Sequence, residues 1–264
     1  METIPFLYTG IFDSHAHYDS ERFDGDRDEV LAALPENGIC GVIDVGCDLP
    51  SSLAAVKLSE SVPNFYAAVG YHPHEADAYN EEDMAKIIEL LKKPRTVAIG
   101  EIGLDYHYDF SPREKQREVF ELQMKLAKEL DVPVIIHSRE ATQDTLEILA
   151  KYPGVQGVVH CFSGSAETAE ILLKIGWHIG FTGVITFSNA RKILDACAVV
   201  PPERLLLETD CPYMSPVPYR GKRCWSPMIQ MTAEKAAEIH GMDPQELIDR
   251  ARENTIRLFR LNNA

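Results

Sequence analysis

Eight short apolar runs, each followed by a segment with helical spacing, constrain the fold of this chain more than any other feature. The runs lie at Gly10–His17, Gly41–Gly46, Phe65–Gly70, Thr96–Glu101, Val132–His137, Gly157–Phe162, His178–Gly183 and Leu205–Asp210. Nearly continuous apolar strands that alternate with helices are typical of a parallel sheet covered on both faces. Eight such units in 264 residues predict a closed (β/α)8 barrel, a TIM barrel, as a single domain over residues 1–264.

The strongest helical pattern begins near position 111 and ends near position 130. Its apolar residues Val119, Leu122, Leu126 and Leu130 recur with the spacing of one helical face. An open doubly wound sheet is the alternative fold, but it would need a Gly-x-Gly-x-x-Gly turn after a strand, and the sequence has none.

The formal net charge of −15 limits the classes of partner. Proteins that track long duplex DNA are usually basic, so the charge argues against that role. Chemistry on a phosphodiester remains open, because two divalent ions would add about +4 of local charge at a site.

Several features predict a cytoplasmic protein. No segment has the basic start and apolar centre of a signal peptide, and no apolar stretch has the roughly 18 residues of a membrane helix. The six cysteines include no Cys-x-x-Cys pair. In a chain of this size they are expected to be reduced thiols.

Polar residues follow the apolar runs at one end, where barrels of this type carry their chemistry. His15 and His17 are two residues apart in a predicted strand. Successive side chains of a strand point to opposite faces, so these two imidazoles share a face. Taken singly, such residues are often helix caps or hydrogen-bonded core histidines. Their common position at strand ends, and the need to pair buried charge, predict a metal site. The ligands expected from the pattern are His15, His17, Glu101, His137, His160 and Asp210.

Six ligands exceed the needs of one tetrahedral ion, so two divalent ions about 4 Å apart are expected. Glu101 lies between the two groups of histidines and is the expected bridge. We expect one ion to be held by His15, His17, Glu101 and Asp210, and the other by Glu101, His137 and His160. Four imidazoles suit Zn, Mn, Fe or Ni better than Mg.

The chain resembles the TatD family of metal-dependent hydrolases, a branch of the amidohydrolase-like barrels. The matching segments span nearly the whole chain and are residues 12–17 (FDSHAH), 100–106 (GEIGLDY), 137–139 (HSR), 160–164 (HCFSG) and 208–212 (ETDCP). The resemblance implies divalent-metal-dependent deoxyribonuclease activity, often 3′ to 5′ exonucleolytic and usually described as Mg-dependent. It also implies that the six residues are the metal ligands. Many related amidohydrolases bridge their ions with a carbamylated lysine, where this chain has Glu101.

Asp210 is the candidate catalytic base, because its carboxylate can take a proton from a water activated by the ions. Glu208 precedes Asp210 by two residues, and Asp13 precedes His15 by two. Both carboxylates are candidates to orient imidazoles, with a salt bridge inside the barrel as the alternative.

Phosphate needs donors besides the metals. Arg139 lies at the same rim as His137 and can grip phosphate with paired N–H groups. Ser163 and Gly164 open the helix after the sixth strand, where free backbone N–H groups favour an anion, although plain helix capping is the alternative.

The loop after the eighth strand contains Arg220, Lys222 and Arg223. Arg220 is expected to face the phosphate, against the alternative of a solvated charge run. His72 is expected to contact the substrate rather than a metal, and His178 to be structural.

Two features near the mouth are open to more than one interpretation. Family members often have an Asn-Glu-Pro-like segment where this chain has Cys224–Pro227, and Trp225 could stack on a base or pack the loop. Tyr106 and His107 follow the Glu101 segment and are expected to line the pocket.

The leading interpretation is a phosphodiesterase that acts on single-stranded DNA ends, with no membrane or obligate protein partner. A small-molecule amidohydrolase, lactonase or phosphotriesterase is one alternative, and a non-catalytic metal-binding adaptor is another. The sequence leaves open the physiological substrate, the preference for DNA or RNA, the polarity, the working metal and the oligomeric state.

Overall fold

The computed structural model describes residues 2–261. In this part of the chain eight parallel strands pair in sequence order from the first to the last. They are β1 (Ile11–Ala16), β2 (Ile39–Val45), β3 (Phe65–Val69), β4 (Thr96–Asp105), β5 (Val134–Arg139), β6 (Gly157–Val159), β7 (His178–Phe181) and β8 (Leu205–Leu207).

The sheet closes where β1 meets the segment that follows β8. The amide of Asp210 donates to the carbonyl of His15 (2.9 Å), and the amide of His17 donates to the carbonyl of Cys211 (2.8 Å). The Thr209 hydroxyl adds a bond to the Asp13 carboxylate (2.6 Å). The predicted TIM barrel is therefore confirmed, and each predicted apolar run overlaps one of its strands.

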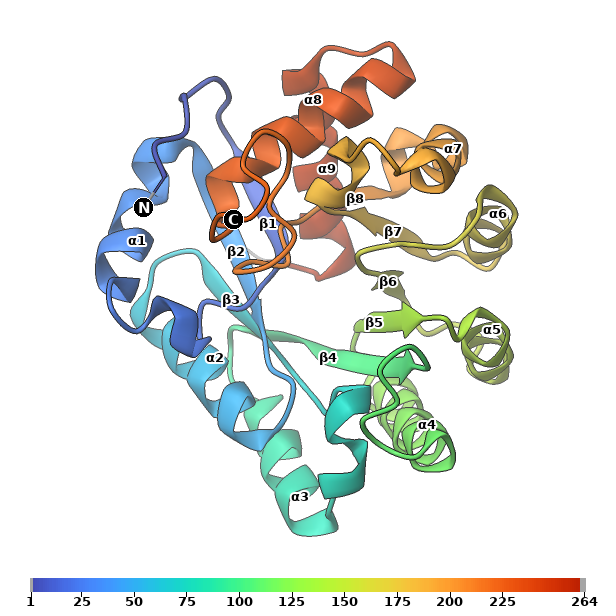
Figure 1. Ribbon diagram of the computed structural model, residues 1–264. Coiled ribbons are helices and arrows are strands. Elements are labelled where there is room, and N and C mark those ends of the chain that lie inside the picture. The colour runs from blue at the N-terminus through green and yellow to red at the C-terminus, as the bar shows by residue number, and fades with distance from the viewer. Residues whose placement is uncertain (1, 262–264) are drawn as a thin grey trace.

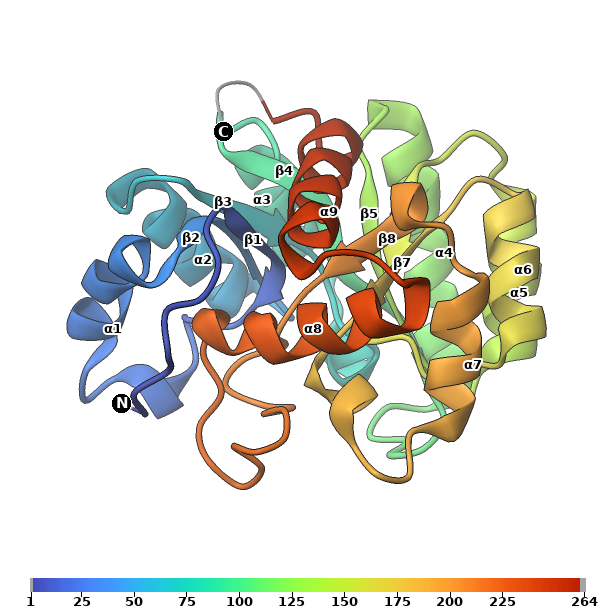
Figure 2. The ribbon, with the colours of Figure 1, turned by 90° about the horizontal axis from the view of Figure 1, so that it is seen from above.

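Helices surround the strands, with α1 and α2 on one side of Figure 1 and α5 to α7 on the other. In Figure 2 the long loop after β8 extends on the side of the molecule away from α9. The helices are α1 (Arg27–Ala33), α2 (Leu49–Ser61), α3 (Glu81–Leu90), α4 (Arg113–Leu130), α5 (Thr142–Lys151), α6 (Ala166–Lys174), α7 (Arg191–Val199), α8 (Ile229–His240) and α9 (Pro244–Leu258). Short 3-10 helices lie at Glu21–Phe23, Pro35–Asn37, Pro73–Ala78, Gly183–Thr186, Pro202–Arg204 and Ser226–Met228.

Helix α4 forms where it was predicted but buries a different face from the predicted leucine stripe. Leu122 and Leu130 are exposed, whereas Gln116 and Gln123 are buried. The buried amides bind the loops at the strand ends: Gln123 accepts from the amide of Tyr71 (2.8 Å) and donates to its carbonyl (3.0 Å). Because the amide groups satisfy buried backbone atoms, their burial costs little and they displace leucine from the inner face.

Two further findings concern the chain as a whole. All six cysteines are free thiols. Between residues 2 and 261 no helix combines the length and the apolar character that crossing a membrane requires.

Candidate metal centre

His15 in β1 and His17 just after this strand point their Nε2 atoms at one place. These atoms lie 3.1 Å apart, and the Nδ1–H of His17 donates to the carbonyl of Val45 at the end of β2 (2.8 Å). Since Nδ1 of His17 carries the hydrogen, Nε2 of the neutral ring presents a lone pair to the barrel mouth.

A bulge in β4 places Glu101. Ile99 pairs with Val134 and Ile102 pairs with Ile136, so β4 has one extra residue over this stretch. Bulges turn a side chain away from the regular alternation of a strand. Gly100 permits the close approach to β5, because a Cβ there would lie 2.8 Å from the Cβ of Ile135.

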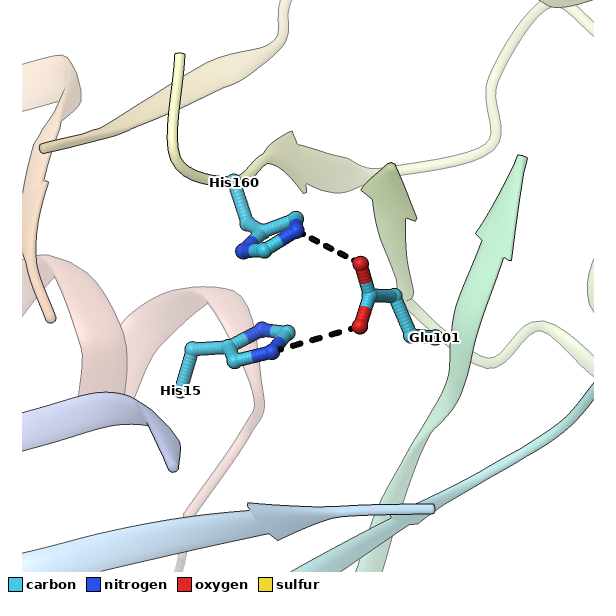
Figure 3. Close-up of side chains that lie close together, drawn as sticks. All are labelled: His15, Glu101 and His160. Carbon is cyan, nitrogen blue, oxygen red and sulfur yellow. Dashed lines mark ion pairs between the residues drawn. The ribbon is translucent and has the colours of Figure 1, made fainter. Parts of the chain in front are cut away.

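The Glu101 carboxylate lies between two groups of imidazoles, one at each oxygen. Its Oε1 lies 2.6 Å from His160 Nε2 and 2.8 Å from His137 Nδ1. Its Oε2 lies 3.4 Å from His15 Nε2 and 3.9 Å from His17 Nε2. Figure 3 shows His15 and His160 approaching opposite oxygens of this carboxylate.

Asp210 completes the first group. It follows β8 with φ of +59°, a left-handed conformation that side chains other than glycine adopt infrequently. Its Oδ1 lies 3.4 Å from His17 Nε2 and 3.8 Å from His15 Nε2. The structure therefore brings together all six of the expected ligands.

In the centre, the carboxylates of Glu101 and Asp210 face imidazole nitrogens. Burial alone would raise the pKa of Glu101, but the imidazole of His160 holds that pKa well below its ordinary value. Burial opposes the charged form of His17, yet Asp210 raises the pKa of this imidazole to about 10. Without another cation, a proton has to occupy the space between these groups.

The tautomers give a test of whether the residues fit a metal. Both nitrogens of His137 face carboxylates, Nε2 that of Asp105 (3.1 Å) and Nδ1 that of Glu101 (2.8 Å), and a neutral ring, which carries one hydrogen, presents a lone pair to one of the two. His17 presents a lone pair to Asp210 in the same way. A lone pair facing a carboxylate is stable only with a cation between them, so the donor set fits divalent metal ions. The groups His15–His17–Asp210 and His15–Glu101–His160 each have ligand atoms within 4.8 Å of one another.

Sequence reasoning missed Asp105, which holds His137 from behind. Its Oδ2 also accepts from His74 Nε2 (3.0 Å), and the carboxylate is almost fully buried. Burial opposes its charged form, but the hydrogen bond from His137 and other donors lowers the pKa of Asp105. Asp105 stands inside the matching segment 100–106, and it was overlooked because the fourth strand was expected to end at Glu101.

Cys47 is a second residue of the centre that the sequence pattern did not mark. Its Sγ lies within 4.8 Å of ligand atoms of His17 and Glu101. Burial raises the pKa of this thiol well above its ordinary value. The residue follows β2, and a single cysteine after an apolar run gave no signal of its place.

The two candidate orienting carboxylates have different partners. Glu208 Oε1 lies 3.6 Å from His160 Nδ1 and accepts the amide of Cys161, so it faces an imidazole as expected. Asp13 instead accepts from backbone and hydroxyl groups, including Ser226 Oγ (2.7 Å), and does not orient the imidazole of His15. Asp13 binds β8 to β1, so neither the orienting role nor a salt bridge describes it.

His72 lies in the mouth beside Glu101, with its Nε2 3.6 Å from Oε1. Its Nδ1 accepts the amide of His74 (3.1 Å), so Nε2 carries the hydrogen of the neutral ring. Burial lowers the pKa of His72 well below its ordinary value and keeps the ring neutral. His72 therefore presents a donor, which suits an acceptor on a substrate better than a metal.

Arg139, Ser163 and Gly164 line one cavity of about 320 Å³ at the start of α5 and α6. Lys192 and Glu140 line the same cavity, so two cationic side chains and one carboxylate face it. Helix capping is provided by Ser165, which accepts the amide of Thr168 (3.3 Å), and this leaves Ser163 free for a ligand.

The basic loop after β8 holds two of its three cations in ion pairs. Arg223 donates two hydrogen bonds to the Asp26 carboxylate (2.7 and 2.6 Å), and Lys222 lies 3.2 Å from Glu2. Arg220 is exposed and stacks on the ring of Phe187 at 4.1 Å. Of the three, Arg220 alone keeps its guanidinium free of an ion pair within residues 2–261.

Three further expectations are decided by packing. Trp225 is buried and packs the loop, so it presents no face to a base. Tyr106 donates to Asp144 (2.5 Å) and His107 pairs with Glu140 (2.8 Å), so both turn toward α5 and its loop rather than into the pocket. His178 is buried at the start of β7, away from the mouth, as a structural residue would be.

Known proteins share both this sequence and this architecture. A model of the family described as TatD related DNase matches residues 12–260. The uncharacterized metal-dependent hydrolase YabD of Bacillus subtilis (strain 168) is 42% identical over 254 residues, which cover 96% of this chain and 100% of the relative. The 3′-5′ ssDNA/RNA exonuclease TatD of Rahnella sp. (strain Y9602) is 35% identical and covers 96% of this chain and 99% of its own length.

A solved structure gives the same result. The crystal structure of YJJV, a TatD homolog from Escherichia coli k12, superposes with a TM-score of 0.89 at 31% identity, and covers 97% of this chain and 100% of its own. With the barrel, the ligand set and the matching family in agreement, the chain belongs to the TatD family of metal-dependent hydrolases.

Proposed function

We propose that this protein hydrolyses phosphodiester bonds of single-stranded DNA from its 3′ end with the help of two divalent metal ions. The observation that carries the proposal is the Glu101 carboxylate, whose two oxygens face two separate groups of imidazoles. Sites with a shared carboxylate and two ions are typical of enzymes that cleave phosphate esters.

Each ion would have its own set of residues. His15, His17, Asp210 and Oε2 of Glu101 would hold the first, and His137, His160 and Oε1 of Glu101 the second. Divalent ions held there would lower the pKa of water and offset the charge of the phosphate.

The remaining chemistry belongs to the side chains. Asp210 is half-buried beside His17, and its carboxylate would accept the proton of the attacking water. Nε2–H of His72 would donate to an oxygen of the phosphodiester. Arg139, Ser163 and Gly164 would bind a phosphate in their cavity, and Arg220 would approach the strand from the opposite loop.

Two lines of support favour nucleic acid over a neutral lactone or amide. Arg139 and Lys192 face one cavity of a protein whose net charge is −15. Relatives that cover nearly the whole chain are named 3′-5′ ssDNA/RNA exonucleases.

The test is digestion of oligonucleotides by protein stripped of metal and reloaded separately with Mg²⁺, Mn²⁺, Zn²⁺, Fe²⁺ or Ni²⁺. Single strands labelled at either end, in DNA and RNA forms, are compared with a lactone and an aryl ester. We expect mononucleotides to appear from the 3′ end, and Glu101→Gln to lower the rate about 10³-fold by removing the shared charge.

Other outcomes separate the alternatives. Turnover of the lactone or ester without cleavage of DNA would favour a small-molecule hydrolase. Absence of turnover with every metal, in protein whose metal content is measured, would favour an adaptor.

A further inference from the structure

Two aromatic rings stand exposed on the loop that follows β4. Tyr108 is 48% exposed and Phe110 is 69% exposed. Their ring centroids lie 5.3 Å apart with the planes inclined by 20°, so the rings are stacked. Exposed apolar surface of this kind is costly in water and commonly marks a binding surface. We call Tyr108 and Phe110 the aromatic platform.

The aromatic platform is joined to the metal centre through His74 and Asp105. The His74 ring lies 5.6 Å from Tyr108 and 4.8 Å from Phe110, both edge to face. Asp105 accepts from His74 and His137 through Oδ2, and its Oδ1 accepts the amide of Tyr108 (2.8 Å). One buried carboxylate therefore fixes both the proposed ligand His137 and the start of the platform loop.

A free cation lies beside the platform. The Arg139 guanidinium is 4.8 Å from the centre of the Tyr108 ring and has no carboxylate within ion-pair distance among residues 2–261. The acidic neighbours have partners of their own, since Asp109 pairs with Arg113 (2.6 Å) and Glu140 accepts a hydrogen bond from His107 (2.8 Å). Arg139 also lines the cavity with Ser163, so it joins the platform to the proposed phosphate site.

We infer that the aromatic platform stacks a nucleobase of the single-stranded substrate next to the phosphate held by Arg139. The inference rests on the proposed function and adds to it where the strand lies. The aromatic platform can stack on the π-face of a base, and the adjacent guanidinium of Arg139 can bind the phosphate of the same nucleotide. Because bases in a duplex already cover one another's faces, the platform selects single strands, and because every base has a π-face, it is tolerant of sequence.

The first experiment compares matched oligonucleotides that carry a normal or an abasic residue near the 3′ end. Loss of base stacking at one position is expected to lower kcat/KM about five- to 100-fold for the wild type. The double variant Tyr108→Ala/Phe110→Ala should lose a similar factor on the normal strand, mainly in KM, and should no longer distinguish it from the abasic strand.

Two controls separate stacking from damage to the fold. Tyr108→Phe/Phe110→Tyr keeps both rings and should restore discrimination between the strands. Phe6→Ala removes a ring that is 55% exposed but lies against Gly38 at the amino end of β2, and it should leave the discrimination intact.

A binding measurement needs no turnover. With 2-aminopurine at the tested position, wild-type protein should quench the fluorescence of the base, and the double alanine variant should not. If the wild type cleaves oligonucleotides while both proteins respond alike to the abasic strand, the platform is overturned and the proposed function stands. If the wild type cleaves no oligonucleotide with any metal and quenches nothing, both proposals fail.

Discussion

At the scale of single residues, the centre depends on which nitrogen of each ring carries the hydrogen. Val45 takes the hydrogen of His17, which leaves Nε2 of that ring for a cation, whereas His137 faces Asp105 through Nε2 and Glu101 through Nδ1. These partners raise the basicity of the imidazoles as well as fixing their orientation. The pKa of His137 is accordingly raised by Asp105 and Glu101, against the effect of burial.

Asp105→Asn is expected to weaken metal binding about 10- to 100-fold, because partners behind a liganding imidazole have effects of that size. Titration of metal-free protein by calorimetry measures the affinity. Asp109→Asn is the matched control, since Asp109 lies in the same loop but pairs only with Arg113 on the surface. Equal affinities of the two variants would contradict the role given to Asp105.

Asp210→Asn should lower kcat about 10²- to 10⁴-fold, with a smaller change in KM, if Asp210 accepts the proton in the rate-limiting step. Metal content measured on the same sample separates this effect from loss of a ligand. A variant that binds its full metal and keeps more than a tenth of the wild-type kcat would show that another group is the base.

The sequence marked residues of the centre only where a polar side chain ended a predicted strand. His15, Glu101 and His160 were found in this way and meet in space. Asp105 and Cys47 were not, because their places depend on the extension of β4 and on the path of the chain after β2. Neither follows from apolar patterning.

At the scale of elements, β4 does the most to place the centre. Its bulge turns Glu101 into the mouth, and the strand then continues to Asp105. Gly103 allows that continuation, because it has φ of +142° and a Cβ there would collide with the carbonyl of His137. The same glycine thus controls the distance between β4 and a proposed ligand on β5.

Gly103→Ala should lower the free energy of unfolding by more than Gly154→Ala does. Both glycines have positive φ, but a Cβ at Gly154 meets nothing within 4 Å. Backbone strain costs about 1–3 kcal/mol at either position, and the collision at Gly103 adds about 1–3 kcal/mol. Urea denaturation of both variants gives the difference, and equal losses would show that β5 moves aside freely.

Helix α4 shows how tertiary contacts override a sequence pattern. Spacing alone placed Leu122 and Leu130 on the helical face of Val119, yet they are exposed. The buried face includes Gln116, which accepts the amide of Asp105 (2.9 Å) and donates to its carbonyl (3.1 Å). Hydropathy could not identify that face. Burial of a side-chain amide is favourable only when the amide forms hydrogen bonds with the backbone of a neighbouring loop, and the sequence pattern does not show that loop.

At the scale of the whole molecule, the two ends of the barrel hold residues of different kinds. The mouth gathers the centre, whereas the amino end holds structural residues such as His178. Burial and the charges of Arg204 and Arg257 lower the pKa of His178 to about 4. An imidazole that must stay neutral in the folded state makes the barrel sensitive to acid.

The sign of that effect follows from the two pKa values. The folded protein, with a pKa of about 4 at His178, binds fewer protons than the unfolded chain, whose histidines titrate near 6.5. The stabilisation is fully present above about pH 6.5 and is lost as the pH falls toward 4, with about 2 kcal/mol gone at pH 5.

His178→Gln should therefore lose less stability than the wild type between pH 7 and pH 5. Denaturation in the presence of a chelator measures the difference without a contribution from metals. His107→Gln, at an exposed histidine, is the control and should follow the wild type. If the wild type lost no more free energy of unfolding between pH 7 and pH 5 than the His178 variant, the lowered pKa of His178 would be refuted as the cause of the acid sensitivity.

The sequence by itself determined the barrel and the end at which its polar residues meet, because strand periodicity and the direction of parallel strands are local properties that repeat along the chain. Only the tertiary structure decided which oxygen of Glu101 faces which histidine, that Asp105 contacts His137, that Trp225 is buried and that Arg223 pairs with Asp26. Those arrangements arise from contacts between segments far apart in sequence, whose geometry depends on a bulge, a glycine and the packing of loops.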